Sequence, residues 1–160
     1  MKKVLIFPIL LILGVISISG CTSSNSTSTD NATFNNSFMS FQYPNGMNVS
    51  DIGDVITGKN ASDTIAIMSN HKDNLGNPME MDIIVEPKTD YQDSLTEDPS
   101  WTDKGNFTSP KGVSYNLQIS DNGVVDYHFI KNGKYFELIG YINTTPEDKQ
   151  LLENIIENIS

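Results

Sequence analysis

The segment Val113–Ile159 constrains the fold of this chain most strongly, because its turns and its apolar residues together predict a strand register. Asn132-Gly133 separates two runs of β-forming residues, and Asn-Gly suits a two-residue type I′ hairpin, in which both central residues have positive φ. Such a loop places His128 opposite Glu137. Because side chains alternate between the faces of a strand, one face of the hairpin is apolar. That face consists of Val125, Tyr127, Phe129, Phe136, Leu138 and Ile142.

The opposite face of this hairpin mixes polar and apolar residues. Its second strand is expected to run from Lys134 to Ile142. The polar members are two acids and a histidine, and two tyrosines and several aliphatic residues lie beside them. The face consists of Val124, Asp126, His128, Ile130, Tyr135, Glu137, Ile139 and Tyr141.

The strand before this hairpin, Val113–Ser120, alternates strictly between apolar and polar residues. A two-residue loop would place Leu117 opposite His128, on the polar face. A three-residue loop over residues 121–123 keeps the apolar sets together, and a slip of one residue moves a whole set to the wrong side. We therefore expect the longer loop, with Gly123 in the left-handed position. The pairs are then Ile119 with Val125, Leu117 with Tyr127, and Tyr115 with Phe129.

An amphipathic helix follows the third strand. Thr145 suits the N-cap, Pro146 the first helical position, and the acids Glu147 and Asp148 the positive end of the helix dipole. Apolar residues then recur at helical spacing: Leu151, Leu152, Ile155, Ile156 and Ile159. We expect this helix to cover the apolar face of the three strands.

Residues 1–20 are typical of a signal peptide. Lys2 and Lys3 precede an apolar run, Val4–Ile18, which is short for a membrane span of roughly 20 residues. The sequence Ile18–Cys21 resembles a lipobox, and this resemblance implies that Cys21 is lipidated and becomes the first mature residue. The alternative is an ordinary signal peptide, or an uncleaved anchor, with a stray cysteine. Cys21 is the single cysteine, so no disulfide forms within the chain.

A tether of Ser, Thr and Asn is expected from residue 21 to residue 37. Such a composition buries too little apolar surface to fold alone. Asn25, Asn31 and Asn35 each begin an Asn-x-Ser/Thr pattern, so a glycosylated stalk is one interpretation and chance in a polar tract is the other.

Residues 38–160 are predicted to form one domain of the α+β class, an antiparallel sheet with a C-terminal helix. Beyond the C-terminal part, the strand candidates are Phe38–Tyr43, Asp54–Gly58, Thr64–Asn70, Glu80–Glu86 and Trp101–Phe107. A short helix is expected within Thr89–Thr96.

Four segments follow one another along the chain: Phe38–Met47 as opening strand and turn, Val113–Ile119, the Asn132-Gly133 hairpin with Tyr135, and the helix after Pro146. In these segments and their order the chain resembles the PsbP-related lipoproteins, some of which occur in methanogenic archaea. It implies a PsbP-like α/β/α sandwich. Two departures are Met47, where an aromatic residue is usual, and a short segment for the middle helix, so the second helical layer is expected to be reduced. The family supplies no catalytic motif.

Composition limits the partners. The chain has ten basic residues, all lysine, against twenty acids, for a net charge of −10. Without arginine or a basic cluster, nucleic acid binding is not expected. Acidic repulsion from anionic lipid leaves the lipid on Cys21 as the expected link to the membrane, with the domain outside the cytoplasm.

The sequence predicts no catalytic residue, no metal site and no cofactor. Neither histidine lies in a recognisable nucleophile motif. The loop around His71 and Asp73 offers possible metal ligands, but Leu75 stands where an EF-hand needs an oxygen, and a solvated loop is the simpler interpretation. His128 opposite Glu137 is either an acid–base pair or, more simply, a cross-strand ion pair on an exposed sheet.

The polar sheet face is the predicted ligand or partner surface. It comprises Asn116, Gln118, Asp126, His128, Tyr135, Glu137 and Tyr141. The alternative is that residues 44–62 or 88–100 fold over it. We expect a non-catalytic binding or accessory module of the cell envelope that recognises an envelope protein or a small ligand. An extracytoplasmic hydrolase is the alternative, which a pocket with several titratable groups of perturbed pKa would favour.

Overall fold

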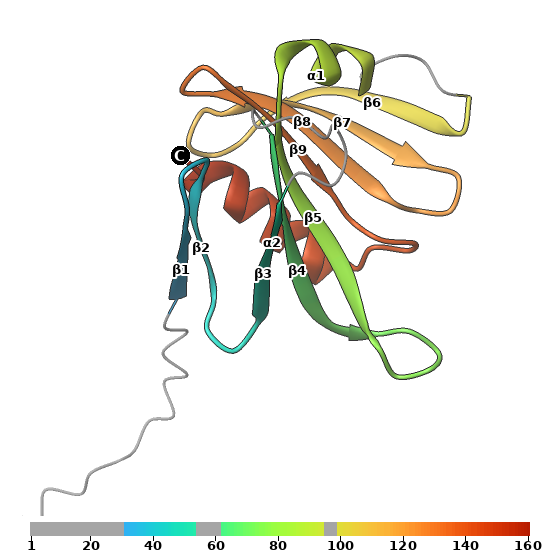
Figure 1. Ribbon diagram of the computed structural model, residues 1–160. Coiled ribbons are helices and arrows are strands. Elements are labelled where there is room, and N and C mark those ends of the chain that lie inside the picture. The colour runs from blue at the N-terminus through green and yellow to red at the C-terminus, as the bar shows by residue number, and fades with distance from the viewer. Residues whose placement is uncertain (1–30, 54–61, 95–98) are drawn as a thin grey trace, which may run out of the picture.

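The computed structural model describes residues 31–53, 62–94 and 99–160. An antiparallel sheet of seven strands has the order β3-β4-β5-β9-β8-β7-β6, and a two-stranded hairpin, β1-β2, lies beside it (Figure 1). The hairpin is β1 (Asn31–Asn35) and β2 (Ser40–Pro44). The sheet strands are β3 (Asn48–Gly53), β4 (Asp63–Lys72), β5 (Pro78–Glu86), β6 (Trp101–Thr108), β7 (Ser114–Ser120), β8 (Val125–Lys131) and β9 (Lys134–Ile139). The helices are α1 (Lys88–Ser94) and α2 (Pro146–Asn158).

The two turns that join β7, β8 and β9 have the predicted geometry. Asn132 and Gly133 have φ of 53° and 75°, and Gly123 has φ of 78°. The resulting pairs include Ile119 with Val125, Tyr115 with Phe129, and His128 with Glu137. Both predicted registers are therefore confirmed.

Helix α2 covers the apolar face of the sheet, as predicted. Thr145 is its N-cap, and the Thr145 hydroxyl accepts a hydrogen bond from the Asp148 backbone N–H at 3.2 Å. At the other end, the Lys131 ammonium donates to the backbone carbonyls of Ile156 and Glu157, which places a cation at the negative end of the helix dipole. Ile155 and Ile156 have no exposed surface, and they belong to the core cluster that also holds Tyr127, Phe129 and Leu138.

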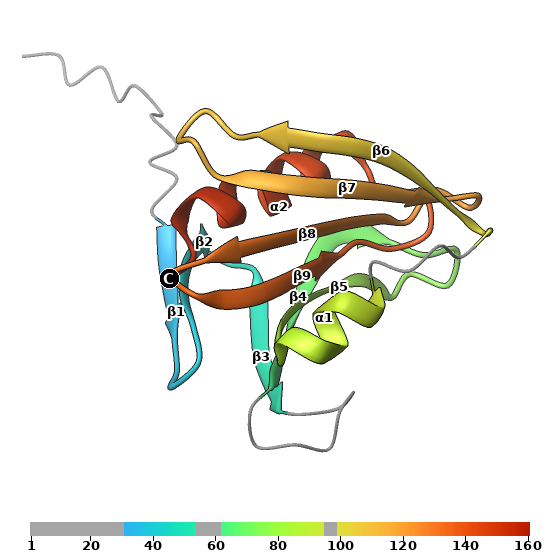
Figure 2. The ribbon, with the colours of Figure 1, turned by 90° about the horizontal axis from the view of Figure 1, so that it is seen from above.

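Helix α1 lies on the opposite side of the sheet from α2 (Figures 1 and 2). The α+β class with a C-terminal helix is thus confirmed. Because α1 has only seven residues, it covers one part of its face, near β5 and β9.

The fold includes residues before the expected boundary at Phe38. Strand β1 pairs with β2 along its whole length, and the Phe34 ring stacks on the Phe41 ring with centroids 5.2 Å apart. Residues 31–37 of the expected tether therefore belong to the fold. Ser40 and Ser160 exchange backbone hydrogen bonds, so the C-terminus is joined to this hairpin.

The chain leaves the sheet after Ile139, earlier than the predicted end at Ile142. Gly140 packs so closely that an added Cβ would lie 2.3 Å from the Thr144 hydroxyl, and the Thr144 backbone N–H bonds to the Tyr141 carbonyl. This turn carries Ile142 out to solvent, where it is 55% exposed, so its predicted place on the apolar face is wrong.

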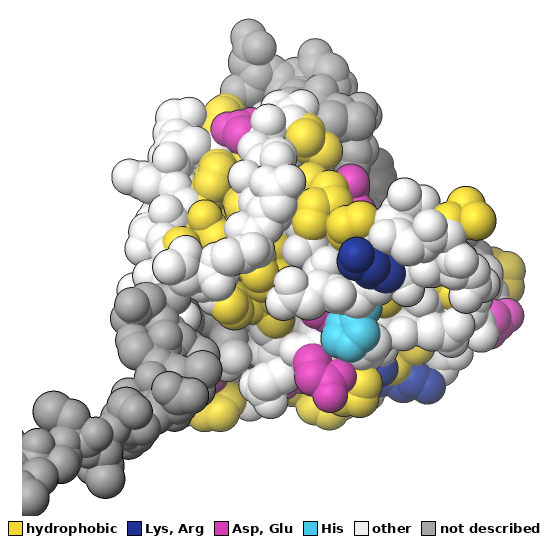
Figure 3. All heavy atoms as spheres, turned by 90° about the horizontal axis from the view of Figure 1, so that it is seen from below, with side chains coloured by type: hydrophobic (Ala, Val, Ile, Leu, Met, Phe, Trp, Pro, Cys, Tyr) yellow, Lys and Arg dark blue, Asp and Glu magenta, His cyan; other side chains and the backbone are white. Residues whose placement is uncertain are grey.

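Strand β3, at Asn48–Gly53, was not predicted, and the predicted strand Asp54–Gly58 lies outside the described residues. Cys21, the lipobox and Asn25 also lie outside them. In the described part of the chain, no helix has the length and apolarity needed to cross a membrane. On the face of the molecule drawn in Figure 3, apolar side chains reach the surface in several places, with acidic and basic side chains scattered around them.

Candidate functional site

Six of the seven residues of the predicted surface share one face of the sheet, opposite α2. They are Asn116, Gln118, Asp126, His128, Tyr135 and Glu137, which follow from the pairings of β7, β8 and β9. Asp126 and His128 are only 6% and 1% exposed. The expectation of a cross-strand pair on an exposed sheet is therefore wrong, although the pairing of His128 with Glu137 itself is confirmed.

Helix α1 supplies the cover. Its first turn forms directly after Pro87, whose carbonyl accepts hydrogen bonds from the backbone N–H groups of Asp90 and Tyr91. The Tyr91 ring lies edge-on to His128, with centroids 5.9 Å apart, and 5.2 Å from the Tyr135 ring. Of the segment 88–100, which was expected as a possible cover, helix α1 therefore does cover the part of this face around His128.

An acid–histidine cluster lies beneath this helix. His128 Nε2 lies 2.9 Å from Asp126 Oδ2, and one ligand atom each from Asp126, His128 and Glu137 lie within 4.8 Å of one another. Strand β5 adds Asp82, which pairs with Ile139 beside Glu137. Three neighbouring strands therefore direct carboxylates into one buried region, which we call the acid–histidine cluster: Asp82, Asp126, His128 and Glu137.

Burial and like charge perturb two carboxyl groups of this cluster, Glu137 and Asp82. Burial raises the pKa of Glu137 to about 9, and the negative charges of Asp126, Glu86 and Asp82 add to the shift. Burial also raises the pKa of Asp82 to about 6, with a smaller contribution from Glu80. Glu137 and Asp82 therefore hold protons at pH values where exposed carboxyl groups are ionised.

An open hollow of about 780 Å³ lies beside the cluster, over β6, β7 and β8. Its polar lining is amide-rich and combines exposed with buried groups. It includes Tyr91, Asp103, Asn106, Asn116, Gln118 and His128. Since His128 belongs to both the hollow and the cluster, the two adjoin, and together they form the candidate site.

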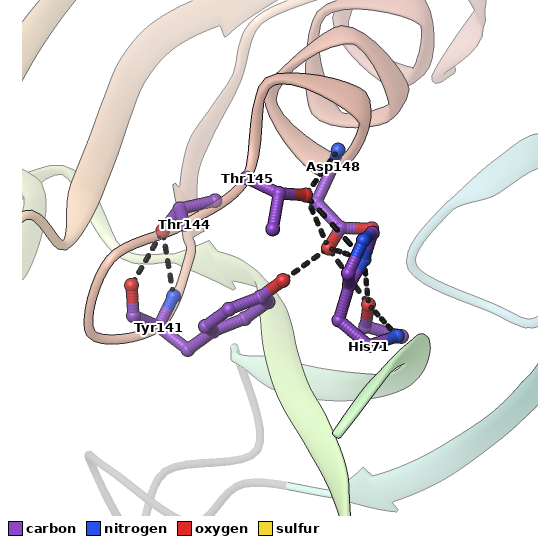
Figure 4. A network of polar contacts seen from close by, with 6 residues as sticks. His71, Tyr141, Thr144, Thr145 and Asp148 are labelled. Carbon is purple, nitrogen blue, oxygen red and sulfur yellow. Dashed lines mark hydrogen bonds and ion pairs between the residues drawn. The ribbon is translucent and has the colours of Figure 1, made fainter. Parts of the chain in front are cut away.

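Tyr141 does not belong to this face, so its predicted place in the surface is wrong. The turn after Ile139 directs its ring toward the start of α2, where its hydroxyl donates a hydrogen bond to Asp148 Oδ2 (Figure 4). The same oxygen accepts from Ser69 at 2.7 Å and lies 3.0 Å from His71 Nδ1. Tyr141 is only 8% exposed and has a structural role in this network.

The loop after His71 forms a turn that the Asp73 side chain stabilises. The Asp73 carboxylate accepts hydrogen bonds from the backbone N–H groups of Leu75 and Asn77, each at 2.8 Å. His71 turns away toward Asp148, at 3.0 Å. His71 and Asp73, the possible metal ligands of this loop, therefore have separate partners.

The chain matches no protein-family model and no curated protein. Reasoning from the sequence found Asp126, His128 and Glu137 but missed Asp82 and Tyr91 as parts of the site. The sequence of β5 did indicate a polar face, because its acids Glu80, Asp82 and Glu86 alternate with buried apolar residues. Nothing in the local sequence indicates that β5 pairs with β9, and this pairing brings Asp82 to the cluster.

Proposed function

We propose that this protein is a lipid-anchored protein of the cell envelope whose folded domain binds a small polar ligand outside the cytoplasm. The observation that carries this proposal is the hollow beside the acid–histidine cluster. Its volume of about 780 Å³ lies within the range of small-molecule sites, roughly 300–1,000 Å³.

The lining of the hollow favours a ligand with several hydrogen-bonding groups. Asn106, Asn116 and Gln118 offer both donors and acceptors, and Tyr91 offers an aromatic surface. The Asn116 amide nitrogen donates to Asp103 at 3.0 Å, while its buried Oδ1 has no hydrogen-bond partner among the described residues. That oxygen is a ready acceptor for a ligand donor.

The lipid on Cys21 would hold this domain at the membrane. The lipobox-like sequence at Ile18–Cys21 supports the anchor, and the net charge of −10 argues against electrostatic attachment to anionic lipid. The absence of arginine argues against nucleic acid as the ligand. The arrangement of helices on both faces of an antiparallel sheet is compatible with a PsbP-like sandwich, with α1 as the reduced second layer.

The ligand can be sought directly by native mass spectrometry of the full-length protein purified from its own membranes in mild detergent. Asn116→Phe places a bulky side chain in the hollow, and Asn154→Phe makes the same change on the exposed side of α2. We expect wild-type protein and Asn154→Phe to carry the same added small-molecule mass and Asn116→Phe to lack it. A mass that Asn116→Phe retains would place the ligand elsewhere, and the recovery of no ligand under any condition would contradict the proposal.

A second candidate, an extracytoplasmic hydrolase, is favoured by one observation. Glu137 and Asp82 have raised pKa values beside a histidine, which is a common arrangement for proton transfer. The binding role remains our first proposal, because Tyr91 and α1 cover these carboxyl groups. If the protein hydrolyses simple ester or phosphoester substrates and His128→Gln abolishes this activity, the hydrolase becomes our first proposal.

A further inference from the structure

We infer that Asp126, His128 and Glu137 form a binding site for a divalent transition-metal ion, and that Zn²⁺ fits it best. This inference goes beyond the proposed function. It depends neither on the lipid anchor nor on the identity of the ligand in the hollow.

The geometry of the three side chains supports coordination. Asp126 and His128 are two positions apart on β8, so they share a face, and Glu137 is the direct cross-strand neighbour of His128 on β9. The three ligand atoms lie within 4.8 Å of one another, and His128 Nε2 lies 2.9 Å from Asp126 Oδ2. A zinc ion about 2.0–2.2 Å from each ligand requires separations of roughly 3–3.5 Å, so the His128–Asp126 separation already suits it and Glu137 must draw closer when the ion binds.

A buried oxygen without a partner is the second observation. Asp126 is more than nine-tenths buried, and its Oδ1 atom has no hydrogen-bond partner in the described part of the chain. Oδ1 of the half-buried Asp82, on β5 at the other side of β9, likewise has no hydrogen-bond partner among the described residues. Within residues 31–53, 62–94 and 99–160, no lysine pairs with Asp82, Asp126 or Glu137. Buried carboxylates are normally paired with a cation or bound to a metal, and a divalent ion would supply the missing positive charge.

The ligand set selects the kind of metal. An imidazole nitrogen suits Zn²⁺ and its neighbours in the first transition row, whereas Ca²⁺ and Mg²⁺ prefer sites made of oxygen alone. One imidazole and two carboxylates give three protein ligands, and zinc sites with three protein ligands keep a further position for water or another ligand. His128 also lines the hollow. A metal there could therefore receive its additional ligand from the hollow.

The competing arrangement has no metal. In it, the Glu137 carboxyl group carries a proton and hydrogen-bonds to Asp126, and His128 keeps its contact with Asp126. The two arrangements differ in their response to Glu137→Gln. The amide is a close substitute for a protonated carboxyl group, but it is a poor zinc ligand.

The test uses the full-length chain in detergent, stripped of metal by a chelator that is then removed. Zinc affinity is measured by competition with a chromophoric chelator, and the melting temperature is followed with Zn²⁺ and with Ca²⁺. The variants are His128→Gln and Glu137→Gln. The control is His71→Gln, the same change at the other histidine of the chain, whose side chain is 44% exposed. Cys21 is common to all four proteins, so its contribution to zinc binding cancels.

We expect Zn²⁺, and not Ca²⁺, to raise the melting temperature of the wild-type protein and of His71→Gln. Both site variants should lose at least roughly tenfold in zinc affinity, since loss of even an outer-shell partner costs that much. Co²⁺ should give d–d absorption bands with the wild-type protein that both site variants lack. The inference is overturned if Zn²⁺ leaves the wild-type melting temperature unchanged, if Glu137→Gln binds Zn²⁺ as tightly as wild type, or if His71→Gln alone loses the ion.

Discussion

His128 Nε2 lies 2.9 Å from Asp126 Oδ2 although both residues belong to the same strand, two positions apart. Both side chains are buried, and the carboxyl group of Glu137 faces them from the adjacent strand. Buried ionisable groups lower the stability of a domain unless they are compensated, and such departures from local rules are concentrated at functional sites. The position of these three residues is therefore our reason for proposing this face of the sheet, rather than the α2 face, as the functional one.

The α2 face should behave as an ordinary hydrophobic core. Ile155→Ala removes a fully buried side chain and should lower the free energy of unfolding by about 2–5 kcal/mol. Ile142→Ala, at a position that is 55% exposed, is the control and should change it by less than about 0.5 kcal/mol. Urea denaturation followed by circular dichroism measures both. A loss below about 0.5 kcal/mol for Ile155→Ala would show that α2 is not docked on the sheet.

The Asp148 network should make stability depend on acid pH. Burial tends to raise the pKa of Asp148, but hydrogen bonds from Tyr141, Ser69 and Thr145, together with the nearby His71, lower it below its usual value. A carboxyl group with a lowered pKa in the folded state stabilises the fold fully at neutral pH. This contribution is lost as the pH falls below the unfolded value of about 3.9 and through the lower folded value.

Asp148→Asn should therefore lower the free energy of unfolding by about 1–3 kcal/mol at pH 7, because several buried donors lose a charged acceptor. Its effect should begin to shrink below about pH 4, where the unfolded wild-type chain takes up a proton at Asp148, and it should disappear only below the lower folded pKa. Denaturant titrations of both proteins at pH 7 and at pH 3 measure the difference. An equal difference at the two pH values would mean that the charge of Asp148 does not stabilise the fold.

The membrane anchor makes a separate prediction. Mass spectrometry of the native N-terminus should show a lipid-modified Cys21 as the first residue, as the lipobox-like sequence indicates. Cys21→Ser should be released from membranes or remain unprocessed. Detection of Met1, or of an unmodified mature N-terminus, would refute the anchor while leaving the folded domain and its site untouched.

Much of the C-terminal half could be predicted because local chemistry specifies it. Asn132-Gly133 and Gly123 adopt positive φ, and each sets a register that the alternation of apolar residues then enforces. The end of β9 was misplaced because the close packing of Gly140 against Thr144 is a tertiary contact. Strand β1 was missed because it is mostly polar: its pairing with β2 has no local signal, and Phe34, which stacks on Phe41, is its one aromatic residue.

The candidate site was predictable only in part, for a similar reason. The pairing of His128 with Glu137 follows from one turn, so it could be predicted. Its burial depends on Tyr91 from α1, and its excess of negative charge depends on Asp82 from β5. These elements are distant in the sequence, and no turn or periodicity specifies where they pair.

Anomalous diffraction at the zinc absorption edge, from crystals of the full-length chain grown with Zn²⁺, tests the role of the acid–histidine cluster most directly. Our account predicts one strong peak within coordination distance of His128 Nε2 and of carboxylate oxygens of Asp126 and Glu137. A peak only beside His71 and Asp148, or none within the sheet, would contradict it.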